Sequence, residues 1–307
     1  MPAKWKLKAQ VQRLLSSMPF GETMNYVMQT RITKTMPVTA RQMLEGRGKK
    51  AVEHLQILQQ IAGLDLANAT FYEFGSGWDL LIPQVFYAAG VNTQVLIDIE
   101  KHARLNLIND IKQKINNHLN PLFEGSGLTP RALPAAPFTQ LQQLHTQLGM
   151  AYHAPCDGRN TGFAANTMDV CTNTFTLEHI PPPDIEAIFK ETFRILKPGG
   201  YVSCFVDMQD HYSYFDKNIS AYNFLQFSDK QWAPYNCSFH YQNRLRHPQY
   251  LQLFEKCGFE VVRNDYKGPS AADLEVLGNL PINAMFASYS LEELGIRSSR
   301  VLLRKPA

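Results

Sequence analysis

The sequence predicts an α/β protein built on a doubly wound, mostly parallel sheet with helices on both faces. From about residue 47, apolar residues at helical spacing alternate with short β-rich runs, the pattern of successive βαβ units. A glycine turn, Gly75-Ser76-Gly77, directly follows the first β-rich run, at residues 70–74. With 307 residues, 45% of them hydrophobic, the chain can bury one large core or two modest ones. A disordered or fibrous protein is excluded.

The predicted elements follow one another in a regular order. The first helix of this alternation carries an apolar stripe of Val52, Leu55, Leu58 and Ile61 and ends at Gly63. A second helix runs from the glycine turn to Gly90. Further helices are predicted around 108–119, at 183–196, at 247–257 and around 291–294, and strands at 70–74, 94–99, 150–153, 169–175, 201–206, 259–263 and 300–304.

Two segments interrupt this alternation. Residues 120–149 are rich in Pro and Gln and weakly periodic, so we expect an insertion with one helix around 139–148. Residues 212–241 hold ten of the chain's 34 Phe, Trp and Tyr residues. The chain is therefore expected to consist of an N-terminal helical segment (1–64) and a main domain (65–307), which includes an aromatic segment at 207–246.

Charge is concentrated at the N-terminus. The net charge is only +3, which is too slight for a dedicated nucleic-acid binder. The first 50 residues hold ten Lys or Arg and two Glu, or +8, which leaves −5 for the other 257. Here Leu7, Val11, Leu14, Leu15 and Met18 follow helical spacing. Such a basic amphipathic helix packs on its own domain or contacts an anionic membrane or a partner, and both alternatives stay open.

The cysteines and the apolar runs bear on the compartment. Cys156, Cys171, Cys204, Cys237 and Cys257 form no CxxC pair, which excludes a zinc ribbon and a disulfide scaffold. No run of about 18 apolar residues and no secretory signal is seen. We expect a protein of the reducing cytoplasm.

The glycine turn and Asp98 indicate a nucleoside site. Glycines allow close approach of a ligand, and the helix start that follows offers free N–H donors. A G-x-G-x-x-G fingerprint for NAD or FAD would need glycine where Leu80 stands. Asp98 follows Gly77 by 21 residues, at the end of the second strand, where a carboxylate accepts hydrogen bonds from ribose hydroxyls. The alternative role for Asp98 is that of a helix N-cap.

In these features the sequence resembles the class I S-adenosylmethionine-dependent methyltransferases, over residues 65–305. Five segments agree in order: Glu73-Phe74-Gly75-Ser76-Gly77, Asp98, Ala154-Pro155-Cys156-Asp157-Gly158, Asp169 through Leu177-Glu178-His179-Ile180, and Leu196-Lys197-Pro198-Gly199-Gly200. The resemblance implies a Rossmann-like, seven-stranded sheet and S-adenosylmethionine as cofactor. The cofactor-binding residues it implies are Glu73, Gly75, Ser76, Gly77, Trp78, Asp98, Asp157, Gly158, Asn173 and Thr174. Trp78 departs from the smaller residue of many members, and it either stacks on the cofactor or packs between helix and sheet.

The reaction that the resemblance implies is the displacement of a sulfonium methyl group by an acceptor atom. A neutral hydroxyl acceptor needs a general base, and the candidates are His211 first, then His179 and His240. We expect a small-molecule acceptor, most plausibly an oxygen of a saccharide or secondary metabolite. No metal is expected, because Asp207 and Asp210 alone are weak indicators of one. Residues 207–246 are expected to form a lid over the acceptor.

Other functions are left open by the sequence. A methyltransferase-fold subunit that binds without catalysing is disfavoured by the presence of Glu73, Asp98 and Asp157. Methylation of nitrogen or carbon, in a small molecule or a lipid, is a further alternative. A nicotinamide oxidoreductase is disfavoured by Leu80.

Overall fold

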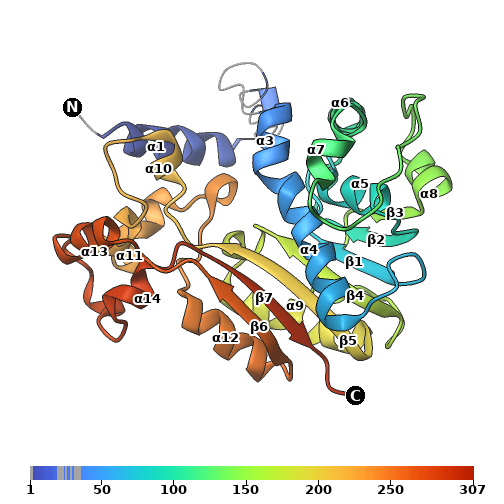
Figure 1. Ribbon diagram of the computed structural model, residues 1–307. Coiled ribbons are helices and arrows are strands. Elements are labelled where there is room, and N and C mark those ends of the chain that lie inside the picture. The colour runs from blue at the N-terminus through green and yellow to red at the C-terminus, as the bar shows by residue number, and fades with distance from the viewer. Residues whose placement is uncertain (1–2, 19–23, 25, 28–29, 31–35) are drawn as a thin grey trace.

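A seven-stranded sheet forms the centre of the molecule (Figure 1). The computed structural model describes residues 3–18, 24, 26–27, 30 and 36–307. The strands are β1 (Thr70–Phe74), β2 (Thr93–Ile97), β3 (Met150–His153), β4 (Met168–Thr174), β5 (Leu196–Asp207), β6 (Glu260–Tyr266) and β7 (Ser298–Arg304). Their order is β3-β2-β1-β4-β5-β7-β6, and β1 to β5 pair in parallel while β7 is antiparallel to both neighbours. The predicted doubly wound, mostly parallel sheet is confirmed.

Helices cover both faces of this sheet. The described helices are α1 (Lys4–Ser16), α3 (Ala40–Glu45), α4 (Arg47–Ala62), α5 (Leu81–Ala88), α6 (Leu105–Asn117), α7 (Leu119–Phe123), α8 (Gln142–Leu148), α9 (Pro182–Ile195), α10 (Tyr212–Phe215), α11 (Asp229–Trp232), α12 (His247–Lys256), α13 (Ala271–Gly278) and α14 (Leu291–Gly295). Figure 1 shows α4 and α5 on one side of the sheet and α9 and α12 on the other.

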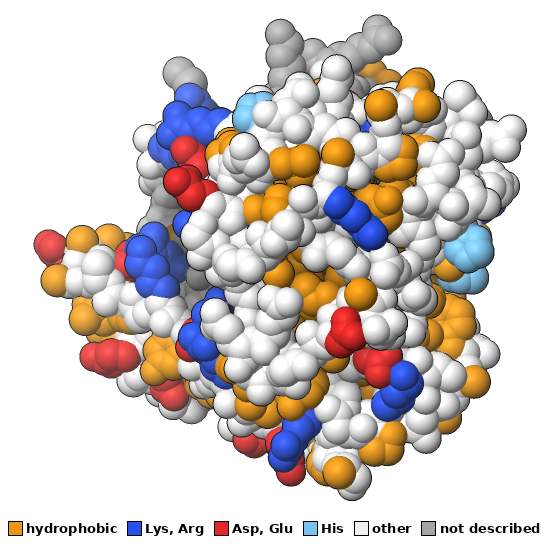
Figure 2. All heavy atoms as spheres, turned by 45° about the vertical axis from the view of Figure 1, so that its right-hand side comes forward, with side chains coloured by type: hydrophobic (Ala, Val, Ile, Leu, Met, Phe, Trp, Pro, Cys, Tyr) orange, Lys and Arg blue, Asp and Glu red, His pale blue; other side chains and the backbone are white. Residues whose placement is uncertain are grey.

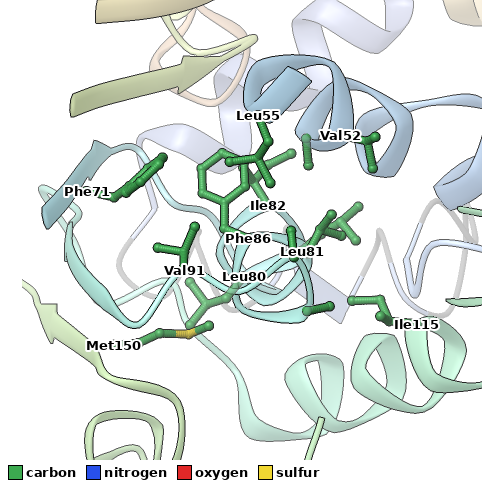
Figure 3. Packing of buried hydrophobic residues seen from close by; sticks show 14 of the residues in the cluster. Val52, Leu55, Phe71, Leu80, Leu81, Ile82, Phe86, Val91, Ile115 and Met150 are labelled. Carbon is green, nitrogen blue, oxygen red and sulfur yellow. The ribbon is translucent and has the colours of Figure 1, made fainter. Parts of the chain in front are cut away.

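The alternation of side chains along the strands divides the core into two layers. Phe71 of β1 packs with α4, α5 and α6, whereas its neighbour Tyr72 packs with α9 and α12. In the first layer, Leu55 of α4 and Phe86 of α5 lie next to Phe71 (Figure 3). Because α4 is embedded in this layer, the helix that ends at Gly63 forms part of the same core as the sheet.

The glycine turn does not itself begin a helix. The prediction of a helix from the turn to Gly90 is too early at its start, because Leu80 has a left-handed backbone (φ 49°) and α5 begins at Leu81. The turn and the residues up to Leu80 therefore form an open loop at the strand end. Helix α13 was not predicted, since only Leu277 of its side chains is buried and no apolar stripe marks it.

Helix α1 packs on the aromatic segment, residues 207–246 (Figure 1). It does so through Trp5 and Ala9, which are buried with Tyr212 and Trp232. The predicted apolar stripe faces outward instead, with Leu7 57%, Val11 43%, Leu14 58% and Met18 41% exposed. Thus α1 packs on its own domain and still exposes an apolar stripe. Contact with a membrane or a partner through it stays a prediction. Glu22, Arg31 and Lys34 of the basic region lie outside the described residues.

The surface over α5 to α8 mixes charges of both signs. Figure 2 turns this side of the molecule forward and shows a few Lys, Arg, Asp and Glu side chains among larger areas of hydrophobic and uncharged atoms. Within the described part of the chain, no helix is both long and apolar enough to span a bilayer.

Candidate active site

A cavity of about 600 Å³ opens at the carboxyl ends of β1, β2 and β4. This edge of a parallel sheet is where doubly wound proteins bind ligands, because the loops there diverge from the sheet. The glycine turn forms one wall. A Cβ on Gly75 would lie 2.5 Å from Thr176, whereas a Cβ on Gly77 would meet nothing within 4 Å. The first glycine therefore permits close packing of two loops, and the second leaves room for a ligand.

Asp98 lies opposite the glycine turn. Its carboxylate accepts a hydrogen bond from the backbone N–H of Gly77 (3.0 Å), and its side chain is largely buried. Burial raises the pKa of Asp98 to about 6, although the charge of His102 and the Gly77 amide act in the opposite direction. A buried carboxylate with an unused acceptor position, facing a cavity, can receive hydroxyl donors from a ligand.

Glu73 lies behind the glycine turn, at the end of β1. Its Oε2 accepts a hydrogen bond from the hydroxyl of Thr172 on the adjacent strand (2.9 Å). Burial raises its pKa to about 8, with a further contribution from the charge of Asp98, while the Thr172 hydrogen bond lowers it. Glu73 does not line the cavity, so it can act on a ligand only through its charge or through water.

Trp78 belongs to an aromatic stack at the mouth of the cavity. Its ring is stacked on His102 (5.5 Å between centroids) and on Tyr26 (5.2 Å), with the guanidinium of Arg104 over both Trp78 and Tyr26. Trp78 also lines the cavity. The observed ring contacts of Trp78 are with Tyr26 and His102, and its stacking on a cofactor stays a prediction.

The wall beyond β3 carries a charged network. The guanidinium of Arg159 bridges Asp157 and Asp184, at 2.8 Å from each. Hydrogen bonds from the Arg159 side chain lower the pKa of Asp157, which therefore stays ionised near neutral pH. Asp157, Gly158 and Arg159 all line the cavity.

The end of β4 is tied to the core rather than to the cavity. Asn173 is buried and donates to the carbonyl of Phe74 (3.4 Å). Thr174 lies 3.0 Å from Nε2 of His54, whose Nδ1 lies 2.7 Å from Ser203. Burial lowers the pKa of His54 to about 3, so this histidine is a neutral link between β4, β5 and α4.

The far end of the cavity is formed by the aromatic segment and the loop after β4. Ser238, Phe239 and Tyr241 line it together with Thr176 and His179. Nδ1 of His179 lies 2.8 Å from the carbonyl oxygen of Tyr241. A carbonyl only accepts, so Nδ1 carries the proton and Nε2 keeps its lone pair.

His211 and His240 lie behind His179 and do not line the cavity. The ring of His211 is 5.0 Å from that of His179 and 6.1 Å from that of His240. Burial lowers the pKa of His179 to about 4 and that of His240 to about 3. Of the three predicted bases, His179 is thus the one at the cavity wall.

The carboxylates that follow β5 have different surroundings. Asp207 Oδ2 lies 3.3 Å from Nε2 of His211 and accepts a hydrogen bond from the hydroxyl of Tyr214. Burial raises the pKa of Asp207, but His211 and the Tyr214 hydroxyl outweigh this and lower it overall. Asp210 instead accepts hydrogen bonds from Asn223 and the Tyr212 amide, away from Asp207. The two aspartates do not form a pair.

The structure brings most of the predicted site residues to one cavity. Those that line it are Gly75, Gly77, Trp78, Asp98, Asp157, Gly158 and His179; those behind its wall are Glu73, Ser76, Asn173, Thr174, His211 and His240. Sequence reasoning missed Arg159, Asp184 and Glu178, and it included Phe239 only as a member of the aromatic segment. Glu178 was within a quoted motif but received no role, and its burial was the signal that the sequence lacks.

Part of the chain matches the model of a known protein family. Residues 134–204, from the insertion through β3, β4 and α9 into β5, match the family model of the methyltransferase domain. The match covers 71 of the 307 residues, and over this part of the chain it confirms the predicted resemblance to the class I methyltransferases.

Solved structures similar to this chain include three methyltransferases. A SAM-dependent methyltransferase from Methanosarcina mazei is 14% identical, over 80% of this chain and 97% of that one, with a TM-score of 0.46. Phosphoethanolamine N-methyltransferase 2 from Haemonchus contortus is 14% identical over 92% and 60%, with a TM-score of 0.48. An S-adenosylmethionine-dependent methyltransferase from Mesorhizobium loti is 12% identical over 85% and 99%, with a TM-score of 0.42. No curated protein matches the chain in sequence.

Proposed function

We propose that the protein is an S-adenosylmethionine-dependent methyltransferase that methylates an oxygen of a small acceptor, such as a saccharide or secondary metabolite. The observation that carries the proposal is the division of the cavity into two ends. One end has the glycine turn and Asp98, which suit a nucleoside. The other has aromatic rings and His179, which suit a flat, hydroxyl-bearing acceptor.

The residues at the first end fit S-adenosylmethionine. The open space beside Gly77 would admit the ligand against the turn. We expect Asp98 to accept from ribose hydroxyls and Asp157 to accept from an adenine amino group. The loop lacks a third glycine, which fits a cofactor without phosphates. A cationic ligand at the turn would favour the ionised form of Glu73, which lies behind the turn. When bound, this cofactor supplies an electrophilic methyl group on sulfonium.

The residues at the second end would hold and activate the acceptor. Phe239 and Tyr241 have ring surfaces that would exclude water from the cavity. Exclusion of water strengthens the polar contacts inside the cavity. A hydroxyl must lose its proton as the new C–O bond forms. A neutral imidazole takes such a proton, and we propose His179, the predicted base that lies at the cavity wall, for this step. The five cysteines are free, which supports the proposed reducing, cytoplasmic compartment.

The proposal is tested with methyl-labelled S-adenosylmethionine and a panel of hydroxyl, amine and carbon acceptors. Label should pass to hydroxyl acceptors. Phe239→Ala should slow transfer by about tenfold or more while leaving S-adenosylhomocysteine affinity within about threefold, because a ring that becomes buried against the acceptor contributes roughly 1.5–3 kcal/mol of contact. Phe215→Ala, which removes an exposed ring of the same segment, is the matched control. Transfer to amines or carbon only, or an equal loss of cofactor affinity in Phe239→Ala, would contradict the proposal.

A further inference from the structure

Three potential metal ligands meet at the acceptor end of the cavity. Glu178 and His179 lie on the one-turn helix Leu177–His179 that follows β4, and His211 follows β5. Because β4 and β5 are parallel neighbours, their following loops lie side by side. One ligand atom from each of the three side chains lies within 4.8 Å of the other two.

Glu178 has no partner in this position. Its side chain is 3% exposed, and both carboxyl oxygens are buried without a hydrogen bond. The backbone amides of Glu178 and Asp207 lie near it, but neither makes a hydrogen bond of normal geometry, and the charge of Asp207 repels it. A buried carboxyl group left without a partner is costly unless something compensates for it.

His179 already has the arrangement of a metal ligand. Its Nδ1–H donates to the carbonyl of Tyr241, which fixes the tautomer and leaves the Nε2 lone pair available. Metal-binding histidines characteristically use their second nitrogen in this way, and the bond orients the ring. His179 also lines the cavity, so an ion bound to it would be accessible to an acceptor.

His211 provides the third donor. Its Nε2 is buried and makes no hydrogen bond, although Asp207 Oδ2 is 3.3 Å away. Asp207 is held by Tyr214 and by the side-chain amide of Gln209 (3.2 Å). It can therefore orient His211 or serve as a fourth ligand.

We propose that Glu178, His179 and His211 bind a divalent transition-metal ion. Two imidazoles and one carboxylate form a donor set that Zn²⁺ and Fe²⁺ use in sites with open coordination positions. Ligand atoms around a tetrahedral zinc ion are about 3.4 Å apart, so the three side chains need to close by about an ångström, within reach of side-chain rotation.

This site goes beyond the proposed function and does not rest on it. An ion here would compensate the buried Glu178 and would offer an open position toward the cavity for an acceptor oxygen. It would occupy the lone pairs of both histidines, so neither could act as a general base. The ion itself would then stabilise the ionised oxygen of the acceptor hydroxyl. The expectation of no metal, drawn from Asp207 and Asp210, did not consider Glu178.

The experiment measures metal binding in the absence of cofactor and acceptor. Tag-free protein is stripped with chelator and dialysed against Zn²⁺ or Co²⁺, and bound metal is counted by elemental analysis. We expect one ion per chain with a dissociation constant in the micromolar range or below, and a visible Co²⁺ ligand-field spectrum. Glu178→Gln and His211→Ala should each weaken binding by about a hundredfold or more. His145→Ala, which removes an exposed histidine of α8, should not.

Two results would overturn the proposed metal site. Folded wild-type protein that binds no stoichiometric Zn²⁺ or Co²⁺ overturns the metal site without any reference to the variants. Binding that survives in both Glu178→Gln and His211→Ala, each checked for its thermal unfolding transition, also overturns it. S-adenosylhomocysteine binding is measured separately, so failure of the metal site leaves the proposed function untouched.

Discussion

At the scale of single residues, the two glycines of the turn have different tasks. Both have positive φ, 71° at Gly75 and 77° at Gly77, and the sequence could indicate that the turn needs them. Only the structure shows that Gly75 packs against Thr176 and that Gly77 faces open space. The sequence therefore predicted which loop borders the cavity but not which of its two glycines leaves open space beside it.

Gly77→Ala should lower ligand affinity strongly while lowering the stability of the fold only slightly. The new methyl group would enter the cavity, so we expect S-adenosylhomocysteine affinity to fall at least about tenfold. The positive φ should cost about 1 kcal/mol of stability. Gly63→Ala is the matched control, since Gly63 also has positive φ (57°) and open surroundings but caps α4 far from the site. Titration calorimetry measures the S-adenosylhomocysteine affinity, and thermal unfolding measures the stability. Equal affinities in the two variants would contradict the role of Gly77.

Asp98 should make cofactor affinity depend on pH. Its folded pKa of about 6 means that the free protein carries a proton there below that pH, and a protonated carboxyl is a poorer acceptor for ribose hydroxyls. Affinity for S-adenosylhomocysteine should thus rise with pH from 5 to 7, by up to about tenfold per unit below pH 6. Glu73 stays largely protonated in this range.

Asp98→Asn provides the test of this assignment. It should bind S-adenosylhomocysteine about ten- to a hundredfold more weakly at pH 7, because a hydrogen bond to a charged group contributes roughly 1.5–3 kcal/mol. Its affinity should also be nearly flat between pH 5 and 7. The same pH slope in the variant and in the wild type would assign the titration to another group.

At the scale of elements, the strands were predicted to within a few residues in most cases. Runs such as Thr70–Phe74 are short, apolar and bounded by turn residues, and this pattern is local. Strand β5 was predicted too short, because its additional end residues are defined by pairing with other strands: Leu196 pairs with Met168 of β4, and Asp207 pairs with Ser298 of β7. Contacts between distant segments, such as Trp78 with Tyr26, have no local signal.

The orientation of α1 illustrates the same limit. Apolar spacing placed Leu7, Val11 and Leu14 on one face of the helix and left open what that face contacts. Trp5 and Ala9, on another face, are buried against the domain. The ring of Trp5 on α1 contacts four rings of the aromatic segment, those of Tyr212, Phe227, Trp232 and Tyr235. The ring cluster, remote in sequence, decides which face of the helix is buried.

Trp5→Ala should therefore loosen α1 and the aromatic segment together. We expect a loss of roughly 3–5 kcal/mol, as for other buried aromatic residues, measured by denaturant unfolding. Leu14→Ala on the same helix removes an exposed side chain and should change stability by less than about 0.5 kcal/mol. Similar losses in both variants would show that the outward stripe, rather than Trp5, anchors the helix.

The aromatic segment combines two functions in separate residues. Tyr212, Tyr222, Phe224 and Trp232 form a core, while Phe239 and Tyr241 reach the cavity. Deleting residues 218–235 would remove part of that core, so single substitutions at the cavity are the sharper probe of the acceptor end.

At the scale of the whole molecule, the sheet order accounts for the position of the site. The loops after β1, β2, β3 and β4 meet at one edge, so residues as distant as Gly77, Asp98 and Asp157 share one cavity. The sequence motifs were sufficient to predict this meeting because each follows a strand. The acceptor end was not predictable in detail, since it is formed by the aromatic segment, whose residues follow no repeating pattern.

The identity of the ligand at the glycine turn is the central claim, and thermal unfolding with added ligand tests it most directly. A ligand that binds only the folded state stabilises it by about 2.7 kcal/mol at a hundredfold excess over its dissociation constant. S-adenosylhomocysteine should raise the melting temperature of the wild-type protein more than that of Gly77→Ala at the same ligand concentration, and NADH should raise neither. Stabilisation by NADH, with none by S-adenosylhomocysteine, would contradict the account.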